Sequence, residues 1–255
     1  TLELVPNSNL IIGADFDRYS WMIGAFDLLG NVVKTKEVPV NGTAPETCFK
    51  TLAAGIRDFA QTLDPPPIRL LGVGVPGLVD ADHGVITSAA QFDWFHVDVK
   101  KIMQEELGWP AVVVNRFRAR GLTECRYGSG RSFNHLVYIG VGTGIAAGLY
   151  IDRLLLSGAL GGAGELGHIT VEPNGPLCAC GNHGCLQALS SELAIEQEFR
   201  RLLRAGETTS LMSPEFDLQR IKALAICQAA DEGDELAARV VGQAASYLGI
   251  AMANL

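Results

Sequence analysis

The chain has 255 residues, of which 48% are hydrophobic and 19% charged, a balance typical of a folded protein that excludes an intrinsically disordered one. Its net charge of −8 argues against a nucleic-acid-binding surface within this chain, because such surfaces cluster lysine and arginine. The first residues do not resemble a secretory leader. The longest uncharged apolar run, residues 136–151, is short and rich in glycine for a membrane span. We therefore expect a cytoplasmic protein without membrane contact.

The apolar patterns predict secondary structure along the whole chain. In the first half they indicate three strands within residues 10–38, a helix over 45–63, a buried strand over 68–75 and a short helix over 97–107. A strand over 111–114, a helix over 115–126 and strands over 136–141 and 145–151 follow. The remainder is predicted to be helical over 190–204, 218–230 and 235–255, with a loop over 205–216. Strands followed by helices, twice, favour an α/β fold with two lobes, which we expect over residues 1–128 and 129–255.

The two ends of the chain carry their own signals. It begins at Thr1 rather than at a methionine, and the final helical pattern reaches Leu255 without a glycine or proline stop signal. We therefore expect a fragment that is cut at both ends.

Three of the six cysteines lie within eight residues, which indicates a metal site in a reduced protein rather than a disulfide framework. The pattern joins one imidazole to three thiolates: His168, Cys178, Cys180 and Cys185. Such a set suits a closed tetrahedral zinc site, which would be structural because no position is left for a reactive water. His183 is an alternative ligand, although its place between two cysteines would strain the loop. Three unrelated thiols in a loop are the other, less favoured interpretation.

Around this cluster the sequence resembles the ROK family of repressors, open reading frames and sugar kinases. The resemblance rests on Gly-Glu-Leu-Gly-His at 164–168 and on PNGPLCACGNHGCL at 173–186. It extends to VGVPGLVD at 73–80, to Asn115 with Glu124 nine residues later, and to GVGTGIAAG at 140–148. It implies an actin-like (ribonuclease H-like) fold with a sugar cleft between two lobes.

The same resemblance implies zinc on the His168 and cysteine cluster and sugar hydroxyls on a small set of side chains. That set is Asn115, Glu165 and His168, to which we add Gly77 and Gln187. Relatives carry glutamate at the position of Gln187, and glutamine keeps an acceptor there while adding donors, so we expect altered specificity. On the residues alone, Asn115 could simply cap a helix and Glu165 could be a solvated loop charge. Trp94 could line the cleft or belong to the core.

The kinase machinery of the family is altered at three places. Its kinases carry Asp after the asparagine, whereas this chain has Arg116, which cannot accept a proton. They carry Asp-x-Gly-x-Thr after the first strand, whereas residues 15–19 read DFDRY, so Asp17 brings a side chain and a negative charge toward a bound phosphate. The Gly142-Thr143-Gly144 turn that would take nucleotide phosphates is kept, but alanines follow it.

We therefore expect the sugar-sensing effector domain of a ROK-family transcriptional repressor, without kinase activity and without bound ATP or Mg²⁺. The opening LELVPNSNLIIGADFDR resembles the linker after a repressor's winged helix-turn-helix, so DNA would be bound only by a domain absent from this chain. The resemblance also implies a homo-oligomer, a dimer or a tetramer. Alternatives are an ATP-dependent hexose kinase with an unusual base, or a scaffold that binds no ligand. Arg116 could instead bind an anionic sugar, or with Arg118 it could be a solvated helix charge.

Overall fold

The computed structural model describes residues 3, 5–40, 44–64, 67–159, 161–212 and 217–255, and packing divides the chain into two compact units. The first unit comprises Thr1–Tyr138 and Gly148–Ala163, and the second comprises Ile139–Ala147 and Gly164–Leu255. Residues 129–138 pack with the first unit, whereas the sequence predicts a lobe boundary before them. The lobes 1–128 and 129–255 stay a prediction.

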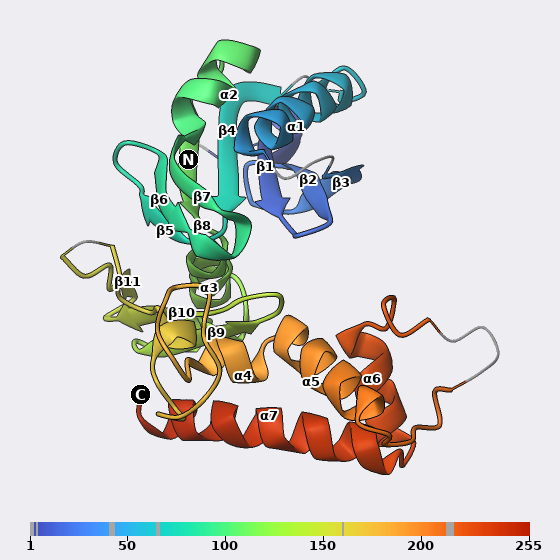
Figure 1. Cartoon of the computed structure of the whole chain (residues 1–255). Coiled ribbons are helices and arrows are strands. Elements are labelled where there is room, and N and C mark those ends of the chain that lie inside the picture. Colours follow the sequence, from blue (N-terminus) through green and yellow to red (C-terminus); the bar gives the residue numbers. More distant parts are fainter. Residues whose placement is uncertain (1–2, 4, 41–43, 65–66, 160, 213–216) are drawn as a thin grey trace. The chain divides into compact units, whose positions relative to one another are not determined.

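A five-stranded mixed sheet forms the centre of the first unit (Figure 1). Its strands, in spatial order, are β3 (Val32–Pro39), β2 (Ser20–Phe26), β1 (Leu10–Phe16), β4 (Pro67–Val75) and β8 (Ala111–Asn115). The pairs β1–β2 and β2–β3 are antiparallel, while β4 runs parallel to both β1 and β8. Apolar side chains alternate along β1 and the neighbouring strands, which gives the sheet one fully buried face.

Helices α1 (Pro45–Ala60) and α2 (Val99–Leu107) pack together over that buried face. Proline at the first position of α1 suits a helix start, because the missing N–H would have no partner there. Asp98 caps α2 by accepting from the N–H of Lys101 at 2.9 Å, and Gly108 ends the helix in the left-handed conformation. The predicted helices over 45–63 and 97–107 are thus confirmed, each with an end that differs by two or three residues.

A second, three-stranded sheet of the first unit was not predicted from the sequence. It contains β5 (Leu78–Asp80), β6 (Val85–Ala89) and β7 (Trp94–Asp98), all antiparallel. The open question on Trp94 is answered here, because its side chain is 2% exposed and packs on Phe16, Phe49 and Phe92. Trp94 belongs to the core.

Helix α3 (Arg116–Arg126) follows β8 directly, and a third sheet follows α3. That sheet has the order β11 (Leu154–Leu155), β10 (Ile145–Ile151), β9 (Leu136–Val141). Short 3₁₀ segments occur at Pro6–Ser8, Ala90–Phe92, Ser129–Ser132 and Leu166–His168. Because β8 ends at Asn115 and α3 begins at Arg116, the sequence around Asn115 forms a strand-to-helix turn.

Helices dominate the second unit: α4 (Leu186–Ser190), α5 (Glu192–Arg204), α6 (Ala223–Asp231) and α7 (Glu235–Ala253). Figure 1 shows α5 and α6 beside α7. Their apolar faces form a separate core that includes Phe199, Ile226, Leu236 and Val240. Helix α6 begins five residues later than the sequence predicts, for a reason given in the Discussion.

In the described part of the chain one helix, α7, is long and apolar enough to cross a membrane by length and composition. Core helices pass the same test, and five residues of α7 are buried in the protein: Leu236, Ala237, Val240, Ala244 and Ala251. The hydroxyl of Ser190 also donates to the carbonyl of Ala244 at 2.9 Å. The expected lack of membrane contact stays a prediction.

Candidate functional site

The first group of predicted residues lies at the carboxyl ends of three parallel strands. In the β1–β4 pair Asp15 is opposite Gly74, and in the β4–β8 pair Val75 is opposite Asn115. Open α/β sheets bind ligands beyond this edge. The register therefore brings Asp15 and Asn115 to the edge where a ligand site is expected.

Asn115 is buried, with 5% exposed, and it caps helix α3 as one reading of the sequence proposes. Its Oδ1 accepts hydrogen bonds from the N–H groups of Phe117 at 2.9 Å and Arg118 at 3.2 Å. Its Nδ2 donates to the carbonyl of Gly77 at 2.8 Å. Two of the predicted sugar ligands, Asn115 and Gly77, are therefore joined by a hydrogen bond.

Arg116, which the resemblance places at the kinases' aspartate, is 7% exposed and faces two carboxylates. Its Nε lies 3.6 Å from Oδ1 of Asp15, and its Nη2 lies 3.5 Å from Oδ2 of Asp17. Arg120, one helical turn further, pairs with the other oxygen of Asp15. We call these four residues the Asp15–Arg116 cluster: Asp15, Asp17, Arg116 and Arg120. Its two positive and two negative charges balance.

The interpretation of Arg116 and Arg118 as solvated helix charges is wrong, because both are less than a tenth exposed. Sequence reasoning failed because the partners of Arg116 lie about a hundred residues earlier in the chain. The role of Arg120 was missed altogether. Its four-residue spacing from Arg116 is the available signal, since side chains four apart share one helix face. That Arg116 binds an anionic sugar stays a prediction, and its guanidinium already has two anionic partners.

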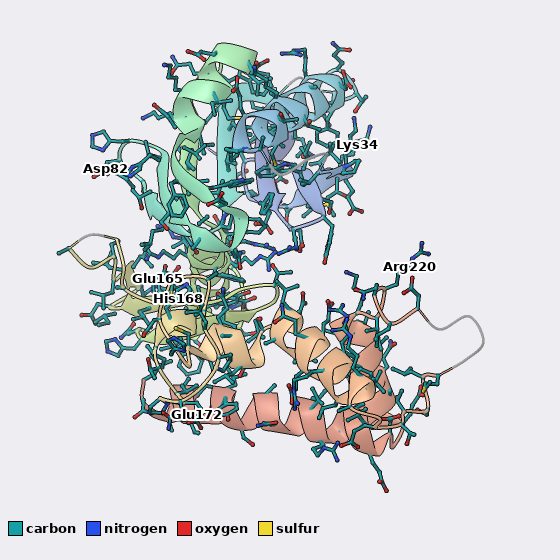
Figure 2. All side chains as sticks on the ribbon, viewed as in Figure 1. Lys34, Asp82, Glu165, His168, Glu172 and Arg220 are labelled. Carbon is teal, nitrogen blue, oxygen red and sulfur yellow. The ribbon has the colours of Figure 1, made fainter. Side chains whose placement is uncertain are left out.

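The second group of predicted residues lies on one loop of the second unit, where Figure 2 labels Glu165 and His168. Glu165 directly precedes the 3₁₀ turn Leu166–His168, and its carbonyl accepts from the N–H of His168 at 3.0 Å. Gly164 has a φ of +87°, and a Cβ there would lie 2.0 Å from the carbonyl oxygen of Ala147. Only glycine fits, so the loop lies tightly against the chain around Ala147.

Two further candidates lie in the same unit. Oε1 of Gln187 accepts from the N–H of Ile145 at 3.1 Å, so this glutamine holds the first residue of the strand that follows the glycine turn. In that turn Gly142 donates to the carbonyl of Gly144 at 3.0 Å, and Thr143 is 8% exposed. The N–H of Glu192, in the first turn of α5, donates to the carbonyl of Gly142 at 2.9 Å. Nucleotide binding by Gly142, Thr143 and Gly144 stays a prediction.

The four predicted metal ligands come together in the loop between residues 168 and 185. Their donor atoms, from His168, Cys178, Cys180 and Cys185, all lie within 4.8 Å of one another. Nδ1 of His168 is 3.6 Å from Sγ of Cys178, and the sulfurs of Cys180 and Cys185 are 3.7 Å apart. A tetrahedral zinc ion with ordinary bond lengths requires edges of about 3.6 Å for N···S and about 3.8 Å for S···S. The donor set and these two spacings therefore fit such an ion.

The shape of the loop depends on its glycines. At Gly184, with a φ of +62°, a Cβ would lie 1.6 Å from the carbonyl oxygen of Glu172. His183, the alternative ligand, turns its Nδ1 to the carbonyl of Gly175 at 3.3 Å and is not a member of the cluster. The choice of His168 as the histidine of the cluster is therefore favoured by the geometry.

Burial sets the protonation of the cluster in the absence of a cation. It raises the pKa of the Cys178 thiol, raises that of Cys185 to about 12, and lowers the pKa of His168. Burial opposes ionisation of Cys180 too, but the N–H of Asn182 and the neighbouring thiols outweigh it and lower its pKa. A bound cation reverses such effects because it stabilises thiolates by direct charge.

Comparison with known proteins identifies the family. The family model described as the ROK family matches residues 11–255. The chain is 33% identical over 207 residues to the xylose repressor of Caldicellulosiruptor bescii, covering 81% of this chain and 51% of the repressor. It is 31% identical over 251 residues to the glucokinase of Thermotoga maritima, covering 96% of this chain and 77% of the glucokinase.

Among solved structures, a ROK family transcriptional regulator that is a homologue of the E. coli Mlc protein is similar with a TM-score of 0.82. It is 29% identical, and the match covers 97% of this chain and 62% of that chain. The chain thus spans between half and two thirds of the length of these regulators. The fold is the actin-like α/β fold predicted from the sequence. Repressors and sugar kinases both occur among the relatives, and the chain belongs to the ROK family.

Proposed function

We propose that this chain is the sugar-sensing portion of a ROK-family transcriptional repressor and that it does not phosphorylate its sugar. The observation that carries this proposal is the Asp15–Arg116 cluster. A guanidinium stands where the family's kinases have a proton acceptor, and it is paired with the carboxylates of the altered phosphate loop.

The chemistry of this cluster opposes phosphoryl transfer in two ways. Arginine stays protonated at working pH, and loss of a positioned base costs on the order of 10²–10⁴ in rate. The carboxylates of Asp15 and Asp17 are engaged by Arg116 and Arg120, so they are poorly available to a nucleotide-bound Mg²⁺. The base position and the phosphate loop are thus altered together. The positive charge of Arg116 offsets the negative charge that Asp17 adds to the loop.

The sugar would be held by the polar groups that the family resemblance implies, namely Asn115, Gly77, Glu165, His168 and Gln187. A carboxylate accepts two hydroxyl hydrogens, and the Nδ2 of Asn115 carries a second N–H beyond the one that Gly77 accepts. Relatives bear names of xylose and N-acetylglucosamine repressors and of glucokinase, so a neutral pentose or hexose is the expected class.

Zinc is the metal that we propose for the cluster of His168 and three cysteines. When bound, it would act as a structural cross-link, because four protein donors leave no position for a substrate. His168 turns Nδ1 to the cluster, so its Nε2 is the nitrogen left for a ligand on the other side. The metal would thereby fix the orientation of one proposed sugar ligand.

In the whole protein, sugar binding would shift the population toward a closed form and change how paired subunits present their DNA-binding domains. DNA contact through a winged helix-turn-helix outside this chain, a homodimer or tetramer, and a cytoplasmic location belong to the same proposal. They rest on the family's repressors rather than on a feature of these 255 residues.

Isothermal titration calorimetry tests the proposal. D-xylose, D-glucose and N-acetyl-D-glucosamine are titrated into the protein, and MgATP is titrated separately. We expect at least one sugar to bind, Glu165→Ala to abolish that binding, and MgATP to give no heat of binding. Tight MgATP binding would instead support the second candidate, an ATP-dependent hexose kinase. The match over 77% of the Thermotoga maritima glucokinase favours that candidate.

A further inference from the structure

Arg118 has a buried guanidinium that the proposed function does not yet use. The residue is 8% exposed, and its Nη2 donates to the carbonyl oxygens of Gly161 and Ala163, the latter at 2.8 Å. Its own carbonyl accepts the hydroxyl hydrogen of Tyr150. A buried cation is costly unless it is hydrogen-bonded, so these contacts account for the burial. All three contacts join residues of the first unit.

The segment held by Arg118 leads directly into the loop of Glu165. Three successive carbonyl oxygens are each held by a different donor: Ala163 by the side chain of Arg118, Gly164 by the N–H of Ala147 at 2.7 Å, and Glu165 by the N–H of His168 at 3.0 Å. The boundary between the two units falls between Ala163 and Gly164. The carbonyl before this boundary is therefore held within the first unit, and the two carbonyls after it are held within the second. Of the three donors, Arg118 is the one that uses its side chain.

Arg118 is also tied to the other proposed sugar ligand. Its main-chain N–H is capped by Oδ1 of Asn115, three residues earlier in the same helical turn. One turn of α3 thus carries a proposed ligand, Asn115, and the guanidinium that fixes the approach to a second one, Glu165.

We propose that Arg118 is a positioning residue for sugar binding, which sets the backbone from residue 161 onward and thereby the place of the Glu165 carboxylate. This inference rests on the proposed function. Arg118 itself need not touch the sugar. Partners that orient metal-binding side chains typically change affinity or activity by about 10–100-fold when they are removed, and we expect an effect of that order here.

The variant Arg118→Met tests this, because it keeps the apolar stem and removes the donors without leaving a buried charge. The matched control is Arg153→Ala. The guanidinium of Arg153 also donates to two main-chain carbonyls, those of Arg131 and Cys125, neither of which belongs to the 161–165 segment.

Amide hydrogen exchange is the first readout and needs no sugar. In Arg118→Met we expect faster exchange over residues 157–165, and in Arg153→Ala we expect unchanged exchange there. The second readout is the dissociation constant of the sugar bound best by the wild-type protein among D-xylose, D-glucose and N-acetyl-D-glucosamine. We expect it to rise about 10–100-fold in Arg118→Met alone.

A double-mutant cycle distinguishes positioning from general damage. If Arg118 acts through Glu165, Arg118→Met weakens binding much less in a Glu165→Gln background than in the wild-type background. Additive losses would overturn the proposal, as would unchanged exchange over residues 157–165 or an unchanged dissociation constant.

Two practical outcomes remain decisive. Should Arg118→Met fail to fold, Arg118→Lys replaces it with the same expectations, because the lysine ammonium ends one bond short of the guanidinium nitrogens. Should the wild-type protein bind none of the three sugars, the proposed function fails. Hydrogen exchange then decides alone whether Arg118 holds the segment.

Discussion

At the scale of single residues, the unusual feature of this chain is a balanced set of four charges, Asp15, Asp17, Arg116 and Arg120. The family resemblance predicts that this set lies at the positions of a kinase's base and phosphate loop. Arg116 and Arg120 lie on one face of α3 and share Asp15, but their exposure differs. The side chain of Arg116 is 8% exposed and that of Arg120 is 43% exposed. Because Arg116 is the more buried of the two, we expect it to contribute more than Arg120 to the free energy of unfolding.

We predict that Arg116→Ala lowers the free energy of unfolding by about 1–3 kcal/mol. This is less than for a fully enclosed pair, because Asp15 and Asp17 keep partial access to water. Arg120→Ala, which removes an exposed arginine from the same carboxylate, should cost less than about 1 kcal/mol. Urea unfolding of both variants measures this. An equal or larger loss in Arg120→Ala would contradict the view that buried Arg116 is the centre of the cluster.

The buried carboxylate of Asp234 predicts how stability depends on pH. Burial alone would raise its pKa, but the N–H groups of Ala237 and Ser210 and the hydroxyls of Thr209 and Ser210 lower it to about 2. With the pKa depressed on folding, the stabilisation is present above about pH 4 and is lost as the pH falls toward 2.

The size of this contribution is on the order of 1–2 kcal/mol, after a discount for solvent screening. We expect Asp234→Asn to be less stable than wild type at pH 6, with a difference that shrinks between pH 4 and pH 2. Urea midpoints over this range give the measurement, and the exposed Asp231→Asn controls for the loss of one charge. A constant difference across all pH values would show that the carboxylate charge is not what stabilises the loop.

At the scale of elements, strands and helices with strong apolar periodicity were predictable, and those shaped by distant contacts were not. The start of α6 is an example. Arg200 donates to the carbonyls of Leu218 and Ile221, and Oε1 of Glu196 accepts from the N–H of Ala223. These contacts hold residues 218–222 outside the helix, although the apolar pattern there favours one. The sequence of residues 218–222 carries no signal for these contacts, because the partners Glu196 and Arg200 lie on another helix, α5.

The candidate site, too, was predictable from the sequence only in part. The cysteine cluster was predictable because its spacing within one loop already limits the geometry. The burial of Arg116 and Arg118 was not, since their partners are Asp15, Asp17, Gly161 and Ala163. The small sheet of β5, β6 and β7 was also missed, because its strands have only three to five residues and little room for alternation.

The metal loop yields the prediction at this scale. We expect one zinc per chain in the purified protein, and we expect Cys185→Ser to reduce the zinc content and to make the loop between residues 169 and 185 sensitive to protease. Cys227→Ser is the matched control, because Cys227 is a partly buried cysteine outside the cluster. Metal analysis and limited proteolysis give the two readouts. Full zinc content in Cys185→Ser would contradict the proposed ligand set.

At the scale of the whole molecule, the account predicts a receptor that is stabilised by its sugar. Binding to the native state alone raises the free energy of unfolding by about 2.7 kcal/mol at a ligand concentration of 100 times the dissociation constant. We expect a sugar of the panel to raise the melting temperature of the wild-type protein and to leave that of Glu165→Ala unchanged. If no sugar shifts the wild-type melting temperature, a scaffold without a ligand becomes the better description.

The most direct test of the central claim is a coupled assay of ADP release at saturating MgATP, with each sugar that calorimetry shows to bind. The glucokinase of Thermotoga maritima serves as the positive control. Sugar binding with ADP release no faster than the background without sugar is the predicted result. Turnover on the order of 1–100 per second, the ordinary range of kinases, would contradict the claim that Arg116 and its carboxylate partners have replaced the catalytic machinery.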